Sequence, residues 1–170
     1  MGMSPSQYFA AFVEPNSSDY RQYPGDIRLA FNAAISTSHF ADHYFNFSKK
    51  HEPHRVAGFK TMGDFVEFLA SETNGAFRDI RSMANAYKHL YNSDGPSAKY
   101  ECINSCGSIE MLRIDGGDEI VELDDGVVPS LEGGSMETVV FTRKDGTKGS
   151  FTCSIDRVIE YFYRLLDGHA

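Results

Sequence analysis

The stretch "ETVVFTRKDGTKGSFTCSIDRVIEYFYRLL", residues 137–166, changes from a strand pattern to a helix pattern along its length. Its first half predicts a β-hairpin, because two β-prone runs flank Asp145-Gly146, a pair that suits a tight turn. From Ser154 onward, apolar residues recur at spacings of three and four. This spacing predicts an amphipathic helix that Ser154 caps and Gly168 ends. Such a helix needs a second layer to cover its wide apolar face.

The N-terminal half of the chain is expected to supply that layer, because its apolar residues also follow a helical period. Ser4, Pro5 and Gln7 form a capping-box pattern at the start of a short helix that we expect to end before Pro15. A loop over 16–25 should follow. The four predicted helices cover about 4–14, 26–47, 61–72 and 77–92.

Short β-prone runs with glycine-rich breaks come after Pro96, at 99–104, 108–114 and 119–123, ahead of the hairpin. Helices followed by a group of strands and one closing helix indicate an α+β fold. We expect a single domain over 1–170, with helices over about 1–95 and 154–168 and antiparallel strands over about 97–153. In this fold an N-terminal helical hairpin or bundle carries a small antiparallel sheet as an insertion, and the C-terminal helix packs back on the bundle.

Composition places the chain among ordinary globular proteins, with 170 residues, 41% hydrophobic and 24% charged. No apolar run approaches the length that spans a bilayer, and the start "MGMSPSQYF" lacks a cationic leader. Three cysteines, Cys102, Cys106 and Cys153, make an odd count that favours reduced thiols. We therefore expect a cytoplasmic protein without membrane association.

The formal net charge of −8 is concentrated in one segment. Residues 101–137 carry ten acidic residues and one basic residue, Arg113, whereas residues 1–100 carry ten of each. An acidic protein repels polyanions at long range, which disfavours non-specific nucleic-acid binding. The acidic segment is also a candidate surface for a basic protein partner.

The helix over 77–92 has a polar flank beside its apolar seam. Arginine, asparagine and histidine follow one another at spacings of three or four, with a lysine at the edge, at Arg78, Arg81, Asn85, His89, Asn92 and Lys88. Arginine holds a phosphate through two parallel hydrogen bonds, and histidine transfers protons near neutral pH. The flank therefore suits phosphodiester chemistry, in which Asn85 could orient the His89 imidazole. It equally suits a solvated flank that ties the helix to its neighbours.

An arginine upstream of "Asn-Ala-Tyr-Lys-His" (85–89), on the second helix of a hairpin, resembles the HEPN superfamily of small helical proteins. Many of its members are metal-independent RNases of toxin–antitoxin and defence systems, with sites formed across a homodimer. The resemblance implies that Arg81 stabilises the transition-state phosphate and that His89 is the general acid/base. Two features differ from the family signature. Seven residues separate Arg81 from His89 here, where the family has four to six, and Ser82 rather than an asparagine directly follows the arginine.

With Asn85 added, these residues form the expected catalytic set, and Arg78 and Lys88 are the expected substrate-binding residues. The resemblance implies RNA or a nucleotide as ligand, no cofactor and a homodimer. The first alternative is a non-catalytic interaction or structural protein, in which the same polar flank locks helices together.

His39 and His43 lie four residues apart on the helix over 26–47, the spacing at which two imidazoles can share a metal ion. A metal-dependent bundle enzyme is therefore a third reading, although we expect no metal site. If the two long helices pack antiparallel as a hairpin, His39 or Asp42 should face Arg81, Asn85 or His89. A pair of Asp42 with His89 or with Arg81 would then orient the functional group. The same contacts would also fix the register of the two helices.

Overall fold

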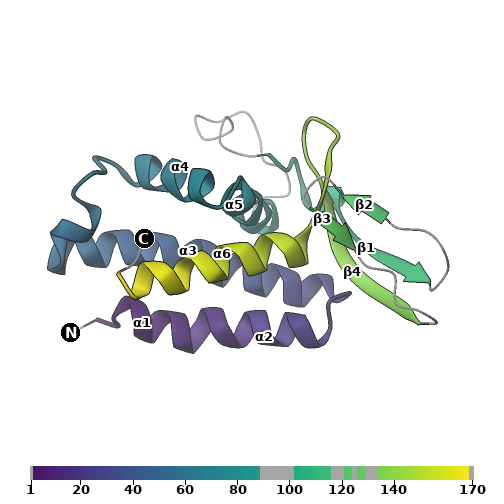
Figure 1. Ribbon diagram of the computed structural model, residues 1–170, viewed down its shortest axis with the longest axis horizontal. Coiled ribbons are helices and arrows are strands. Elements are labelled where there is room, and N and C mark those ends of the chain that lie inside the picture. Colours follow the sequence, from purple (N-terminus) through teal and green to yellow (C-terminus); the bar gives the residue numbers. More distant parts are fainter. Residues whose placement is uncertain (1, 89–101, 116–120, 124–125, 129–133, 169–170) are drawn as a thin grey trace.

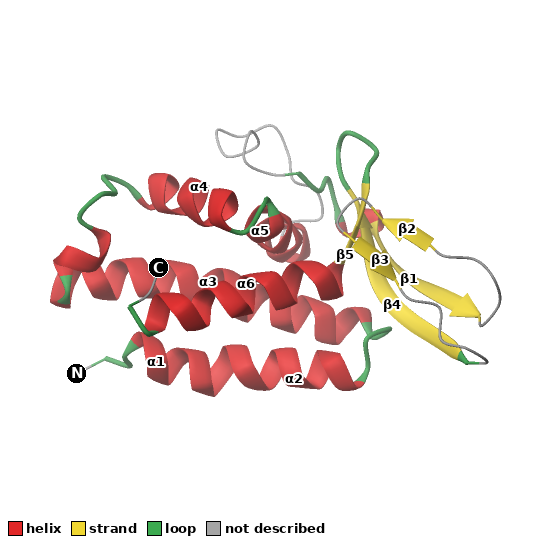
Figure 2. Cartoon of the chain, viewed as in Figure 1, coloured by secondary structure: helices red, strands yellow, loops and turns green. Residues whose placement is uncertain are grey.

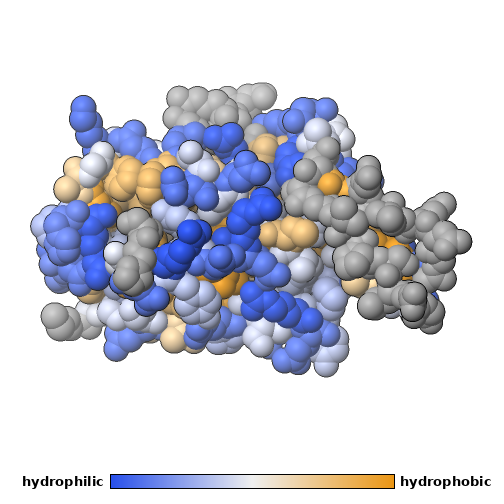
Figure 3. All heavy atoms as spheres, viewed as in Figure 1, coloured by the Kyte–Doolittle hydropathy of each residue, from blue (hydrophilic) through white to orange (hydrophobic). Residues whose placement is uncertain are grey.

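The computed structural model describes residues 2–88, 102–115, 121–123, 126–128 and 134–168. It confirms the α+β fold class, with a helical bundle at one end and a small antiparallel sheet at the other (Figure 1, Figure 2). No helix in these ranges combines the length and the apolar character needed to cross a bilayer. The face shown in Figure 3 is largely hydrophilic, with smaller apolar areas between charged residues.

The N-terminal helix is longer than predicted. It runs without a break through three segments, α1 (Pro5–Tyr8), a π-helical turn η1 (Phe9–Val13) and α2 (Glu14–Gln22). The capping box is confirmed: the Gln7 N–H donates to Ser4 Oγ at 3.2 Å, and the Ser4 N–H donates to Gln7 Oε1 at 2.9 Å.

The predicted helix end before Pro15, and the loop after it, are wrong. Proline disrupts a helix because it lacks an N–H and its ring clashes with the carbonyl four residues back. Here the Glu14 N–H donates to Phe9 O, five residues back, so the turn ahead of Pro15 is wider than an α-turn. The wider turn relieves the clash, so the helix continues to Gln22. This extension places Tyr20 fully buried against the C-terminal helix.

Three further helices complete the N-terminal part, α3 (Ile27–His51), α4 (Met62–Glu72) and α5 (Ala76–Lys88), with a short 3₁₀ turn η2 (Pro53–Val56) after α3. Asp26 caps α3 as predicted, but α3 continues one turn beyond Phe47. The left-handed link between α4 and α5 is also as predicted, since Asn74 and Gly75 have φ of 51° and 85°. The part of the predicted helix beyond Lys88 lies outside the described residues.

The main sheet has the order β1-β4-β5, all antiparallel, and a separate hairpin joins β2 to β3. The strands of the main sheet are β1 (Ile109–Asp115), β4 (Ser135–Thr142) and β5 (Lys148–Ser150), and those of the separate hairpin are β2 (Val121–Leu123) and β3 (Gly126–Val128). The predicted turn is confirmed, with Gly146 at φ 89° between β4 and β5. The strand predicted over 99–104 is not formed at its described residues, 102–104, which lead irregularly to a 3₁₀ turn η4 (Cys106–Ser108).

Helix α6 (Phe151–Leu166) returns to the bundle, as predicted from its apolar face. The predicted cap is wrong, because Ser150 accepts the Cys153 N–H at 3.3 Å and Ser154 is buried inside the helix. Strand β5 runs directly into α6, so the helix starts one turn earlier than its sequence pattern indicates. The ring of Phe162 lies 4.6 Å from Phe40 and 5.9 Å from Phe77, which makes α6 the element that closes the core.

Candidate functional site

The two long helices place Arg81 of α5 against Asp42 of α3. Arg81 Nη1 donates to Asp42 Oδ1 at 3.2 Å, and the two side chains remain 28% and 37% exposed. A contact of Asp42 with Arg81 is among those expected if the two helices pack as a hairpin. Among the described residues, the contact uses only this one guanidinium nitrogen, so the edge formed by Nε and Nη2 makes no protein hydrogen bond. That edge has the geometry that binds a phosphate with two hydrogen bonds.

The other predicted members of the flank are distributed around this pair. Arg78 donates from Nη2 to Glu67 Oε2 of α4 at 2.8 Å, and its buried Nε finds no hydrogen-bond partner among the described residues. Asn85 is half-buried one turn beyond Arg81 and has a polar partner. Lys88 is the last residue of α5. His89 and Asn92 lie outside the described residues, and so does the predicted contact of Asn85 with His89.

His43 faces the N-terminal helix rather than α5. Its Nε2 lies 2.9 Å from Met3 O, and its ring stacks on that of Tyr8 with centroids 4.9 Å apart. His39 is half-buried and also interacts with a neighbouring group. Among the residues with defined positions, no group of three or more His, Cys, Asp or Glu side chains is placed to hold a metal ion.

A groove of about 380 Å³ lies on the side of α3 that faces the N-terminal helix. We call it the α2–α3 groove, and its lining residues are Tyr8, Phe12, Asn16, Asn32, Ile35, Ser36 and His39. Burial raises the pKa of the Tyr8 phenol, and the negative charge of Asp42 raises it further. Asp42, which accepts the hydrogen bond from Arg81, therefore lies close enough to the groove to change the pKa of a residue that lines it. A larger hollow of about 550 Å³ separates the turn at 22–26 from β4 and contains none of the predicted site residues.

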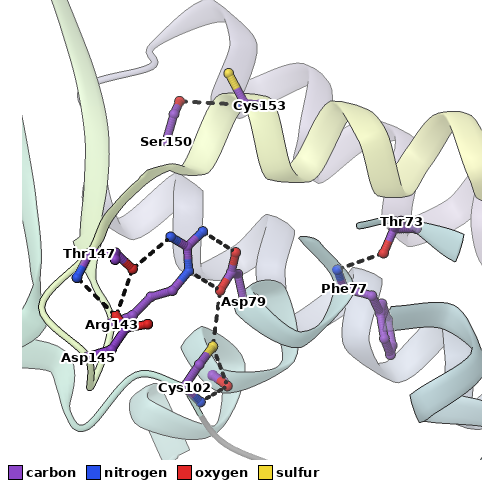
Figure 4. Close-up of polar contacts among 10 residues, drawn as sticks. Thr73, Phe77, Asp79, Cys102, Arg143, Asp145, Thr147, Ser150 and Cys153 are labelled. Atoms are coloured by element: carbon purple, nitrogen blue, oxygen red, sulfur yellow. Dashed lines mark hydrogen bonds and ion pairs between the residues drawn. The ribbon is translucent and has the colours of Figure 1, made fainter. Parts of the chain in front are cut away.

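A buried ion pair between α5 and the sheet was not predicted (Figure 4). Arg143, at the end of β4, donates from Nε and Nη2 to the two carboxylate oxygens of Asp79 at 2.9 and 2.7 Å. The Asp79 side chain is only 6% exposed and that of Arg143 is 18% exposed. Its guanidinium also lies 5.1 Å from the Phe141 ring centre and donates to Thr147 Oγ1 at 3.3 Å.

Cys102 extends this cluster to the segment that precedes β1. Its Sγ donates to Asp79 Oδ1 at 3.0 Å, and its backbone N–H donates to Ser82 Oγ at 2.9 Å. Burial, and next the adjacent Asp79 carboxylate, raise the pKa of the Cys102 thiol to about 12. The thiol therefore stays protonated at neutral pH, and it serves as a hydrogen-bond donor rather than as a nucleophile.

The sequence contained a weak indication of this cluster. Asp79, Ser82 and Ala86 are spaced by three and four residues, so they share the face of α5 that meets the sheet. Asp79 stands between the arginines of the polar flank and is easily assigned to that flank. Its partner is 64 residues away in a hairpin, and no local pattern indicates a contact over that separation.

Comparison of the chain with protein-family models, with curated proteins and with solved structures finds no match in any of the three.

Proposed function

We propose that this chain is a HEPN-like protein that binds RNA at the α3–α5 flank and cleaves it without a metal ion. The observation that supports the proposal best is the contact of Arg81 with Asp42. Asp42 holds one nitrogen of the guanidinium at a partly exposed surface, while no described residue bonds to the edge with Nε and Nη2. A cation oriented in this way can receive a phosphate without a search over side-chain rotamers.

In the proposed reaction, a ribose 2′-oxygen attacks the neighbouring phosphorus and the bond from phosphorus to the 5′-oxygen breaks. His89 either takes the proton of the 2′-hydroxyl or gives a proton to the leaving 5′-oxygen, and water carries out the other proton transfer. Arg81 stabilises the negative charge that develops on the phosphate oxygens. The products would be a 2′,3′-cyclic phosphate and a free 5′-hydroxyl, and the resemblance to HEPN proteins favours a homodimer as the active form.

A second candidate function is a non-catalytic protein in which the flank joins helices. One specific observation favours it: both arginines of the flank are paired with a carboxylate of another helix, Arg78 with Glu67 and Arg81 with Asp42. Partly exposed pairs of this kind contribute about 0–1 kcal/mol each to stability. In this case Arg81 would help to fix the packing of α5 on α3 and would bind no ligand.

The test is RNA cleavage by purified protein in excess chelator, with wild type, Arg81→Ala and His89→Ala prepared in parallel. Arg21→Ala is the matched control, since Arg21 joins α2 to Asp156 of α6 through an exposed ion pair at 2.7 Å. Loss of cleavage in the first two variants only, with cyclic-phosphate products from wild type, supports the proposal. Absence of cleavage by wild type over varied RNAs contradicts it and leaves the second candidate.

A further inference from the structure

The α2–α3 groove has walls of two chemical kinds. One side is aromatic, since the Tyr8 and Phe12 rings lie 4.9 Å apart at 52° and Phe12 is 44% exposed. Apart from Ile35, the other groups are polar and include the side-chain amides of Asn16 and Asn32. Within the described part of the chain, neither amide makes a side-chain hydrogen bond to protein. Two uncommitted amides are therefore available to a ligand beside an exposed aromatic ring.

This combination fits a planar heterocycle with hydrogen-bonding edges. An aromatic side chain stacks on a base of any identity, and an amide offers both a donor and an acceptor to the edge of the base. Half-buried Ile35 adds an apolar surface below them. An apolar ligand without polar edges would leave both amides unpaired against it, which is unfavourable.

The position of the groove also suits a nucleic acid. His39, at one end of the groove, is three residues from Asp42 on α3, so the two residues are separated by about 4.5 Å along the helix axis. Asp42 in turn contacts Arg81 and influences the Tyr8 phenol. Asp42 thus lies near both Arg81 and the groove. Asn32 is ten residues from Asp42, about 15 Å along the helix axis, so a strand bound at Arg81 has to continue along α3 to place a base in the groove.

We propose that the α2–α3 groove binds a nucleobase, stacked on Phe12 and bonded through Asn16 and Asn32, from the same strand whose phosphate Arg81 holds. This inference rests on the proposed function for its choice of RNA as the source of the base. A free mononucleotide offers the same chemistry, and binding measurements distinguish the two sources.

The test uses a labelled single-stranded hexanucleotide in which 2′-deoxyribose prevents cleavage, with fluorescence anisotropy as the readout. Stacking of one base contributes about 1–3 kcal/mol, so Phe12→Ala should raise the Kd at least about fivefold. Asn32→Ala should also weaken binding. Asn32 is an exposed residue in the middle of α3, and alanine favours a helix, so this variant will fold. Tyr23→Ala is the control, because Tyr23 is an aromatic residue 64% exposed outside the groove.

An oligonucleotide that lacks one base tests the contact from the ligand side. It should bind wild type more weakly than the intact strand does, and the difference should shrink in Phe12→Ala because the same contact is already lost. AMP or UMP that binds as tightly as the strand, with ribose 5-phosphate far weaker, would identify a free nucleotide as the source. Equal Kd values for Phe12→Ala, Asn32→Ala and Tyr23→Ala would overturn the inference.

These outcomes are separate from those of the cleavage assay. Groove variants that weaken binding of the deoxy strand, in a protein that never cleaves RNA, would support the groove and refute the RNase reaction. Conversely, cleavage that depends on Arg81, with unchanged binding in Phe12→Ala and Asn32→Ala, would support the reaction and refute the groove.

Discussion

The replacement Arg143→Ala tests the energetic role of the buried ion pair between α5 and the sheet. It removes two short hydrogen bonds, at 2.9 and 2.7 Å, from a carboxylate that is only 6% exposed. Removing one member of a buried pair costs about 3–5 kcal/mol, because the other charge stays buried without compensation. Arg143 is 18% exposed and Asp79 keeps the Cys102 thiol as a donor, so we expect a loss of about 3 kcal/mol at the lower end of this range.

The assay is urea unfolding followed by circular dichroism, with Arg21→Ala as the matched variant. Arg21 also uses Nε and Nη2 on an aspartate, at 3.0 and 2.7 Å, but both side chains of that pair are nearly half exposed. Exposed pairs contribute about 0–1 kcal/mol, so Arg21→Ala should change the unfolding free energy little. For a chain of this size, about 3 kcal/mol corresponds to a fall in Tm of about 6–12 °C. Equal losses in the two variants would show that burial does not determine the strength of the Arg143 pair.

Three further predictions follow from the same region of the fold. The pKa of Cys102 is raised to about 12, so the folded protein keeps a proton that the unfolded chain releases above pH 9. The unfolding free energy should therefore fall as pH rises from about 9 to 12. Urea titrations at several pH values should show that Cys102→Ser reduces this pH dependence. Gly149→Ala would place a Cβ 2.4 Å from the Phe141 ring and should lower the unfolding free energy by about 1–3 kcal/mol. Gly58→Ala is the control, because its Cβ would meet nothing within 4 Å. Thermal melts should show a lower Tm for the first variant and no change for the second. Ser150→Ala removes the N-cap of α6 and should cost about 1 kcal/mol by chemical denaturation; no loss would indicate that the preceding strand alone fixes the helix start.

Most of the fold could be predicted because it depends on local patterns. Capping residues such as Ser4 and Asp26 define helix starts within a few residues, and Asp145-Gly146 defines the hairpin. The errors occurred where a tertiary or non-local effect prevailed. Pro15 is tolerated because the preceding turn widens, and α6 starts at Phe151 because β5 leads directly into it.

The candidate site was predictable only in part for the same reason. Helical spacing placed Arg81 and Asp42 on facing flanks of two helices, and the structure brings them together. The spacing could not show that His43 would contact the N-terminal segment through Met3 O. It also could not reveal the pairing of Asp79 with Arg143, since the distance between them in the chain exceeds the range of any periodic pattern.

The position of α6 in the chain has a consequence for synthesis on the ribosome. The parts of the apolar surface of α3 and α5 that face α6 are covered only when residues 151–166 arrive, since Phe162 lies against both Phe40 and Phe77. At about 5–20 residues per second, the interval between completion of α5 at Lys88 and of α6 at Leu166 is roughly 4–16 s. Throughout that time the nascent N-terminal helices expose aromatic surface. This chain is therefore expected to occupy chaperones during translation and to complete its core only near the end of the interval.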